Sequence, residues 1–158
     1  MSTTVEQPDN AGVRFPPPFI YLLGLLLAWP LERFVPLHLP LGVARWPLAA
    51  VLLLGWLALF FMALPMFRKA RTPVSPVQPT TALMTSGIYS RTRNPLYLGL
   101  ALFYLMVTAI AQSGWMLILL VPVVLVIRFA VIAAEERYLD RRFGQEYLDY
   151  KQRVRRWL

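Results

Sequence analysis

The chain has 158 residues, of which 58% are hydrophobic and 15% charged, and its formal net charge is +8. A soluble domain of this length cannot usually bury so much apolar surface, so the composition favours an integral membrane protein. The chain has no cysteine, which excludes disulfides, thiolate nucleophiles and cysteine-based metal sites. The single histidine, His38, lies between prolines and is expected to be a loop residue, so we expect neither a metal site nor a histidine-based triad.

The positive charge has a simpler explanation than nucleic-acid binding. Basic residues flank membrane spans on the cytoplasmic side, and such an excess requires no nucleic-acid partner. The amino terminus, residues 1–15, is a polar tail without the basic region and cleavage site of a signal peptide. We therefore expect the first apolar run to be kept as a helix.

Four apolar runs predict an all-α integral membrane protein with four transmembrane helices. The runs lie at about 16–34, 46–67, 95–112 and 115–134. The last two are separated by Ser113 and Gly114, so they are expected to form a tight antiparallel hairpin.

The runs also suggest how the chain is organised. Residues 16–68 are expected to form a two-helix membrane anchor, and residues 69–158 contain the polar segments in which we expect a functional site. Three prolines, Pro73, Pro76 and Pro79, interrupt the linker between the two pairs of spans. Because each proline removes a donor and disfavours helix before it, this linker belongs outside the hydrocarbon.

The distribution of basic residues predicts the orientation. With both termini in the cytoplasm, fourteen of the 16 lysines and arginines lie on the cytoplasmic side, and Arg33 and Arg45 lie outside. This orientation brings two polar blocks, residues 85–99 and 135–157, to the same membrane face. We expect the active site to lie there.

The carboxyl-terminal block has the periodicity of amphipathic helices. Its apolar residues recur at steps of three and four, as one face of a helix requires: Leu139, Phe143, Tyr147, Tyr150, Val154 and Trp157. Gly144 is expected to break this block into two helices. The periodicity fits a helix lying on the membrane surface and a lid over a site equally well.

Acidic and basic side chains near the fourth span are candidate site residues. A carboxylate at Glu135 or Glu136 is costly in hydrocarbon, so one of them should pair with an arginine or with a ligand ammonium. Arg128 is expected to face protein or a water-filled cavity, two helical turns before Glu135 and on the same face. A helix-end ion pair to Arg91, Arg93 or Arg137 is the alternative.

The sequence around Asn94 is typical of a helix start. Asn94 can cap a helix, and Pro95 suits its first position. The free N–H groups of such a helix start favour an anionic group, such as a ligand carboxylate.

Several motifs occur together in this order: Gly87-Ile88-Tyr89, Arg93-Asn94-Pro95-Leu96-Tyr97-Leu98-Gly99, Glu135-Glu136, Phe143-Gly144-Gln145-Glu146-Tyr147, and Tyr150, Val154 and Arg156-Trp157. Over residues 73–157 the chain thereby resembles the superfamily of isoprenylcysteine carboxyl methyltransferases and phospholipid methyltransferases. These proteins are integral membrane enzymes. The first two spans are similar to the superfamily only in being apolar.

The resemblance implies S-adenosyl-L-methionine as cofactor, bound at the cytoplasmic face beneath the carboxyl-terminal helices. Matched by motif position, the cofactor-binding residues are Thr81, Ala82, Leu83, Met84, Tyr89, Asn94, Pro95, Leu96, Tyr97 and Glu135. Glu135 can pair with the methionine ammonium, and the helix start can receive its carboxylate.

Two positions differ from the carboxyl-methylating members of the superfamily. Those members usually have histidine where this chain has Asn94, which is common in bacterial-type relatives. They also carry an arginine, assigned to the substrate, four residues before the glutamate, where this chain has Val131. We therefore take Arg128 as the candidate substrate contact.

These observations predict a membrane methyltransferase with a lipophilic acceptor that enters from the bilayer. The acceptor is an isoprenylcysteine-like carboxylate or a lipid amine. No catalytic base is assigned, because methyl transfer by displacement depends mainly on positioning. The alternatives are a nicotinamide-dependent membrane reductase of related architecture and a non-enzymatic membrane subunit that binds anionic lipid.

Overall fold

The computed structural model describes residues 10–13, 15–75 and 77–157, so most of the expected polar tail, residues 1–15, lies outside the described residues. The described part is helical and contains no β-strand. Its α-helices are α1 (Pro17–Phe34), α2 (Arg45–Lys69), α3 (Pro95–Ala111), α4 (Gly114–Val126), α5 (Ala133–Phe143) and α6 (Gln145–Arg153). Short turns of other helix types are η1 (Gly42–Ala44), η2 (Gly87–Ser90) and the π-helical η3 (Ile127–Ile132).

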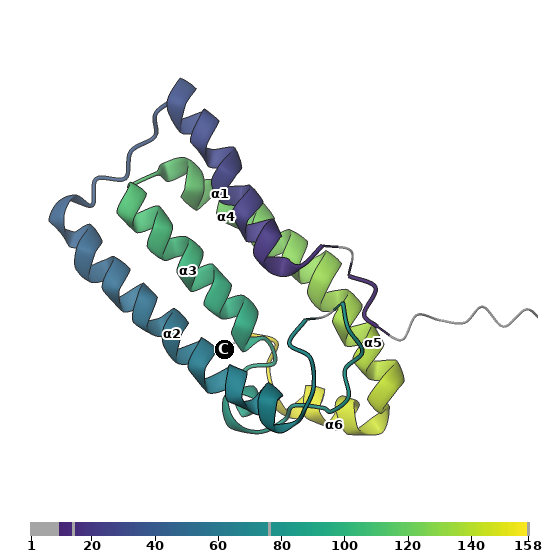
Figure 1. Ribbon diagram of the computed structural model, residues 1–158. Coiled ribbons are helices and arrows are strands. Elements are labelled where there is room, and N and C mark those ends of the chain that lie inside the picture. Colours follow the sequence, from purple (N-terminus) through teal and green to yellow (C-terminus); the bar gives the residue numbers. More distant parts are fainter. Residues whose placement is uncertain (1–9, 14, 76, 158) are drawn as a thin grey trace, which may run out of the picture.

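Helices α1 to α4 lie side by side in an elongated bundle (Figure 1). Helix α2 packs along α3, and α1 packs along α4. Helix α3 also contacts α1 and α4, so it lies between the two pairs. At one end of the bundle α6 runs across the helix ends, near the linker between α2 and α3 (Figure 1).

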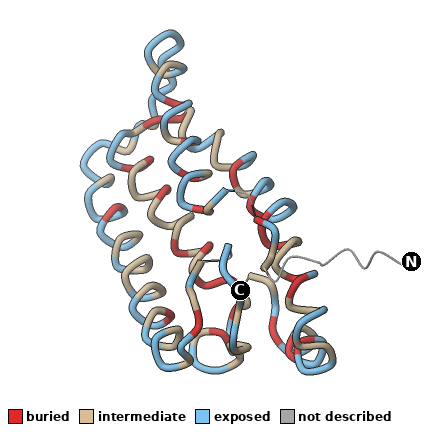
Figure 2. Tube along the Cα trace, turned by 45° about the vertical axis from the view of Figure 1, so that its right-hand side comes forward, coloured by how far each residue is buried: buried red, intermediate tan, exposed pale blue. Residues whose placement is uncertain are grey.

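Two helical stretches are long and apolar enough to cross a membrane, Gly42–Ala70 and Gly114–Phe143. Helix α3 is apolar but shorter. Large apolar side chains point outward from the bundle; Phe61 and Phe129, for example, are about two thirds exposed. Figure 2 shows buried residues between the helices and exposed residues along their outer sides. This outer surface suits lipid contact, and the spans expected at α1 and α3 stay predictions.

The helix that begins at Gly114 does not end at the expected boundary near residue 134. It continues through η3 and α5 to Phe143. The apolar span and the first half of the amphipathic block are therefore one helix, which carries its polar end beyond the bundle. Gly144 breaks it, as expected, with a φ of 52° that favours glycine.

The other end of the bundle is closed by polar contacts around Glu32. Its carboxylate accepts hydrogen bonds from the Ser113 hydroxyl at 2.6 Å and the Leu37 N–H at 2.9 Å, and it lies 3.1 Å from the His38 ring. Ser113 also caps α4 by accepting from the Met116 N–H. These contacts tie the α1–α2 loop to the turn between α3 and α4.

Candidate functional site

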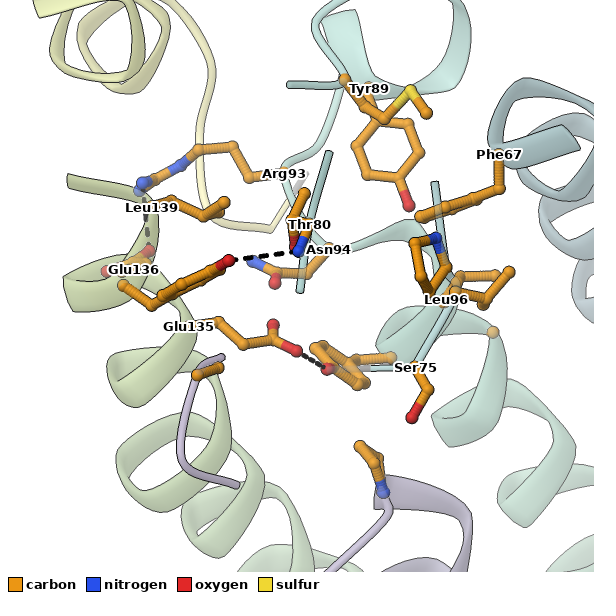
Figure 3. Close-up of a pocket in the computed structure, with 18 of the residues that line it drawn as sticks. Phe67, Ser75, Thr80, Tyr89, Arg93, Asn94, Leu96, Glu135, Glu136 and Leu139 are labelled. Atoms are coloured by element: carbon orange, nitrogen blue, oxygen red, sulfur yellow. Dashed lines mark hydrogen bonds and ion pairs between the residues drawn. The ribbon is translucent and has the colours of Figure 1, made fainter. Parts of the chain in front are cut away.

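A pocket of about 460 Å³ lies at the end of the bundle that α6 covers (Figure 3). Its walls come from α2, the linker after α2, η2, the start of α3, α5 and α6. The segment before α1 contributes Ala11 and Pro16, and the start of α1 contributes Pro17 and Pro18. Pockets of a few hundred cubic ångströms are the usual size for small-molecule sites.

Glu135 reaches the middle of this pocket from α5 (Figure 3). Its Oε1 accepts a hydrogen bond from the Tyr97 hydroxyl at 2.5 Å. Within the described residues no other hydrogen-bond or ion-pair partner contacts this carboxylate, although a carboxylate can accept about four hydrogen bonds. Oε2 is therefore available to a cationic group in the pocket.

The start of α3 contributes polar backbone groups to the same wall. The first helical backbone bond joins the Leu98 N–H to the Asn94 carbonyl, so the helix itself does not use the N–H groups of Leu96 and Tyr97. Asn94 occupies the cap position, but its side chain makes no capping bond, contrary to expectation. It donates instead to the Arg156 carbonyl at 2.9 Å.

Glu136, next to Glu135, is paired with two arginines. Arg156 makes a bidentate contact with it, at 2.9 Å to Oε1 and 2.7 Å to Oε2. Arg93 Nη1 lies 3.0 Å from Oε1, and both of these side chains are 10% exposed. The two adjacent glutamates therefore differ: Glu136 is neutralised by protein cations, and Glu135 is not.

The opposite wall of the pocket is apolar and aromatic. Phe67 at the end of α2 packs edge-to-face on Tyr89, with ring centroids 5.9 Å apart. Trp56 and Phe60 of α2 extend this wall along the bundle. Gly99 of α3 lies against the Trp56 ring, where an added Cβ would be 3.4 Å from it. The pocket thus runs from a polar end at Glu135 to an aromatic wall between α2 and α3.

The linker after α2 forms part of the pocket wall. Its Thr80 N–H donates to the Tyr138 hydroxyl oxygen of α5 at 3.1 Å (Figure 3). Leu83 packs on the cluster of Tyr147, Tyr150 and Val154. The apolar face of α6 therefore packs against the linker and lines the pocket.

The tyrosines of η2 and α6 remain neutral near pH 7. Burial raises the pKa of Tyr147 to about 12, and burial also raises the pKa of Tyr89 and Tyr150. The neutral Tyr150 hydroxyl donates to the Tyr89 carbonyl at 2.7 Å. This bond connects α6 to η2 at the edge of the pocket.

Most of the residues expected to bind the cofactor lie together in this pocket. The lining residues among them are Ala82, Leu83, Met84, Tyr89, Asn94, Leu96, Tyr97 and Glu135. Thr81 and Pro95 do not line it. Thr81 is exposed and bonds to Thr72 and Arg71, and Pro95 is buried at the start of α3.

The expected placement of Arg128 is wrong. Arg128 is exposed, lies over the Phe129 ring and does not line the pocket. In an α-helix, residues seven apart share a face, but the π-helical η3 begins at Ile127 and changes the register before Glu135. Val131, four residues before Glu135, is 2% exposed within the core.

Sequence reasoning missed several lining residues. Tyr138, Tyr147 and Tyr150 line the pocket from α5 and α6, and Phe67 lines it from α2. The spacing of Tyr147 and Tyr150 indicated an apolar helix face, but it did not indicate that this face lines a pocket. No group of three or more potential metal ligands occurs in the ranges the structure describes.

Comparison with known proteins identifies the family of this chain. Residues 44–146, about two thirds of the chain, match the family model for phospholipid methyltransferases. The chain is also 43% identical over 63 residues to an uncharacterized protein of Haemophilus influenzae, an alignment that covers 40% of this chain and all of that protein. No solved structure matches the chain. The chain belongs to the phospholipid methyltransferase family, within the superfamily of isoprenylcysteine and phospholipid methyltransferases.

Proposed function

We propose that this protein is an S-adenosyl-L-methionine-dependent methyltransferase that acts on a lipophilic acceptor in the bilayer. Family membership implies methyltransferase activity in a membrane. The observation that carries the finer proposal is the pocket in which Glu135, without a protein cation, faces an aromatic wall.

The polar end of the pocket fits the amino-acid part of the cofactor. The Glu135 carboxylate would pair with the ammonium, and the N–H groups of Leu96 and Tyr97 would receive the carboxylate at a helix start. Tyr89 and Phe67 supply aromatic surface for the adenine. When bound, the cofactor supplies an electrophilic methyl group on a sulfonium.

The protein's own contribution is positioning and exclusion of water. Transfer of a methyl group to a nucleophile requires the two reactants in line and needs little acid–base chemistry. The linker and α6 cover the polar end of the pocket and would shield it from water. We assign no catalytic base.

The aromatic wall supports an acceptor with an apolar chain. Trp56 and Phe60 lie on a helix long and apolar enough to cross a membrane, so a lipid could approach from the bilayer. The described lining contains one cation, Arg93, which is paired with Glu136. This pairing favours a lipid amine over an isoprenylcysteine-like carboxylate, which would need a cation of its own.

The proposed orientation places the pocket at the cytoplasmic face, with both termini in the cytoplasm. Arg68 and Lys69 end α2 at this end of the bundle, and α5 and α6 carry further basic residues. Arg33 and Arg45 lie at the opposite end. This asymmetry supports the orientation by the positive-inside rule.

Calorimetric titration with S-adenosylhomocysteine tests the cofactor. We expect the detergent-purified protein to bind it and Glu135→Ala to lose binding, because the ammonium loses its carboxylate. Glu146→Ala, which removes an exposed carboxylate from α6, is the matched control and should bind like the parent. A well-folded parent that binds no S-adenosylhomocysteine would overturn the proposal.

Acceptor preference needs a second assay. Labelled methyl transfer from S-adenosylmethionine is measured with phosphatidylethanolamine vesicles and with a prenylcysteine in the same detergent. We expect transfer to the amine and not to the carboxylate. Transfer to the prenylcysteine and not to the amine would show that a cation of the active enzyme pairs with the acceptor carboxylate.

A further inference from the structure

The carboxyl-terminal tail, residues 154–157, joins the two walls that carry the polar groups of the pocket. One wall is the segment before α3, and the other is α5. The Arg93 N–H donates to the Arg155 carbonyl at 3.0 Å, and Asn94 Nδ2 donates to the Arg156 carbonyl at 2.9 Å. The Thr92 hydroxyl also donates to the Arg156 carbonyl, at 3.3 Å.

The side chain of Arg156 extends from this tail to the other wall. It holds Glu136 of α5 in a bidentate contact, and Arg93 holds the same carboxylate from the α3 side. Glu136 and Arg93 are nearly buried, so a single carboxylate balances two guanidinium groups that would otherwise repel each other. Bidentate contacts of this kind also fix geometry, because the planar guanidinium meets both oxygens at once.

Two adjacent carboxylates therefore connect α5 to the region around the start of α3. Glu135 contacts Tyr97, and Glu136 contacts Arg93. The contact at Glu135 lies in the pocket, where a ligand ammonium would share the carboxylate. The contact at Glu136 is closed by protein groups and does not depend on a ligand.

We propose that Glu136, Arg93 and Arg156 form a clamp through which the carboxyl-terminal tail holds Glu135 at a fixed separation from the start of α3. Glu136 is thus a positioning residue and not a ligand of the cofactor. The expected effect of the clamp on S-adenosylhomocysteine affinity rests on the proposed function. The clamp itself is a property of the protein without ligand.

The decisive variant is Arg156→Ala, which removes the side-chain contact between the tail and α5 and leaves the Arg93–Glu136 pair in place. Arg153→Ala, at the end of α6, is the control, because among the described residues its exposed side chain bonds only within its own helix. Hydrogen exchange of the peptide containing Arg93 reports the clamp directly, since the Arg93 amide is bonded to the tail. Calorimetry with S-adenosylhomocysteine reports its consequence.

We expect faster exchange around Arg93 and an affinity loss of about tenfold in Arg156→Ala, and neither change in Arg153→Ala. Arg156→Lys, which keeps the charge but not the bidentate contact, should recover part of both. Glu136→Gln should cost at least as much affinity as Arg156→Ala, because it weakens the contacts to both arginines. The double variant should cost little more than Glu136→Gln alone, because Arg156→Ala removes a contact that Glu136→Gln has already weakened.

Two kinds of result would overturn the inference. Unchanged exchange at Arg93 would show that Arg156 does not hold the tail. If exchange becomes faster but affinity does not change, or if only the melting temperature falls, the contact stabilises the protein and does not position Glu135. A parent that binds no S-adenosylhomocysteine would refute the proposed function, and the exchange of Arg93 in Arg156→Ala would then decide the clamp alone.

Discussion

The two ends of the helical bundle each hold a glutamate close to a loop, but the two carboxylates have different surroundings. Glu32 is contacted by the Ser113 hydroxyl, the Leu37 N–H and the His38 ring. Glu135 accepts one hydrogen bond from the described residues, from Tyr97, and it faces a pocket. The described residues therefore fill most hydrogen-bond acceptor sites of the Glu32 carboxylate and leave most of those of the Glu135 carboxylate unused.

We expect this difference to separate a structural carboxylate from one that binds a ligand. A glutamate whose acceptor sites are filled by its own protein stabilises a turn and has little capacity left for a ligand. An under-bonded carboxylate inside a cavity reduces stability unless a ligand cation completes it. Paired substitutions at the two ends test this reading.

The largest expected effect is on ligand affinity in Glu135→Gln. The amide keeps the shape of the side chain but removes the charge, so S-adenosylhomocysteine affinity should fall by about 100-fold. The melting temperature in detergent should stay the same or rise, because an open carboxylate is removed. Calorimetry and thermal unfolding measure both quantities.

Glu32→Gln is the matched change at the other end. It should lower the melting temperature, because three contacts to a charged group are weakened, and it should leave ligand affinity unchanged. Equal affinity losses in Glu135→Gln and Glu32→Gln would contradict the comparison, since they would indicate that removing either charge affects the whole protein.

A smaller effect is expected from Gly114→Ala. An added Cβ at Gly114 would lie 2.5 Å from Leu37 Cγ and 2.8 Å from the Leu37 carbonyl oxygen, so the turn must move. We expect a loss of about 1–3 kcal/mol in the free energy of unfolding. Ligand affinity of the folded protein should not change, and thermal unfolding beside calorimetry checks both. A loss of affinity with intact stability would show that the two ends are coupled.

Gly144→Ala is the control for the other end of the molecule. The Gly144 φ of 52° strains any residue with a side chain, but no atom lies within 4 Å of the added Cβ. Gly144→Ala should therefore lower the free energy of unfolding only through backbone strain, and by less than Gly114→Ala does.

The sequence predicted the helices from local patterns, and it predicted much of the pocket from motifs that resemble those of the superfamily. Apolar runs and flanking charges define helices, and the motifs around Asn94 and Glu135 occur in a fixed order along the chain. The partners of Glu136 were predicted only as one option among three arginines, because a choice among cations depends on how distant segments pack. Arg156 was not among them, since nothing local indicates that the tail returns to the start of α3.

Arg128 shows most clearly where helical periodicity fails to predict the position of a side chain. Its substitution is also expected to have the smallest effect on affinity and methyl transfer. Seven residues of regular helix would have placed it on the same face as Glu135, two turns away, and a single π-helical stretch places it on the exposed side. Arg128→Ala should therefore change S-adenosylhomocysteine affinity and methyl transfer by less than about twofold. Transfer to phosphatidylethanolamine and to a prenylcysteine is measured for this variant beside the parent. A selective loss with the prenylcysteine would mean that the π-helical turn rewinds when acceptor binds and brings the guanidinium to a carboxylate, and the preference for a lipid amine would then fail.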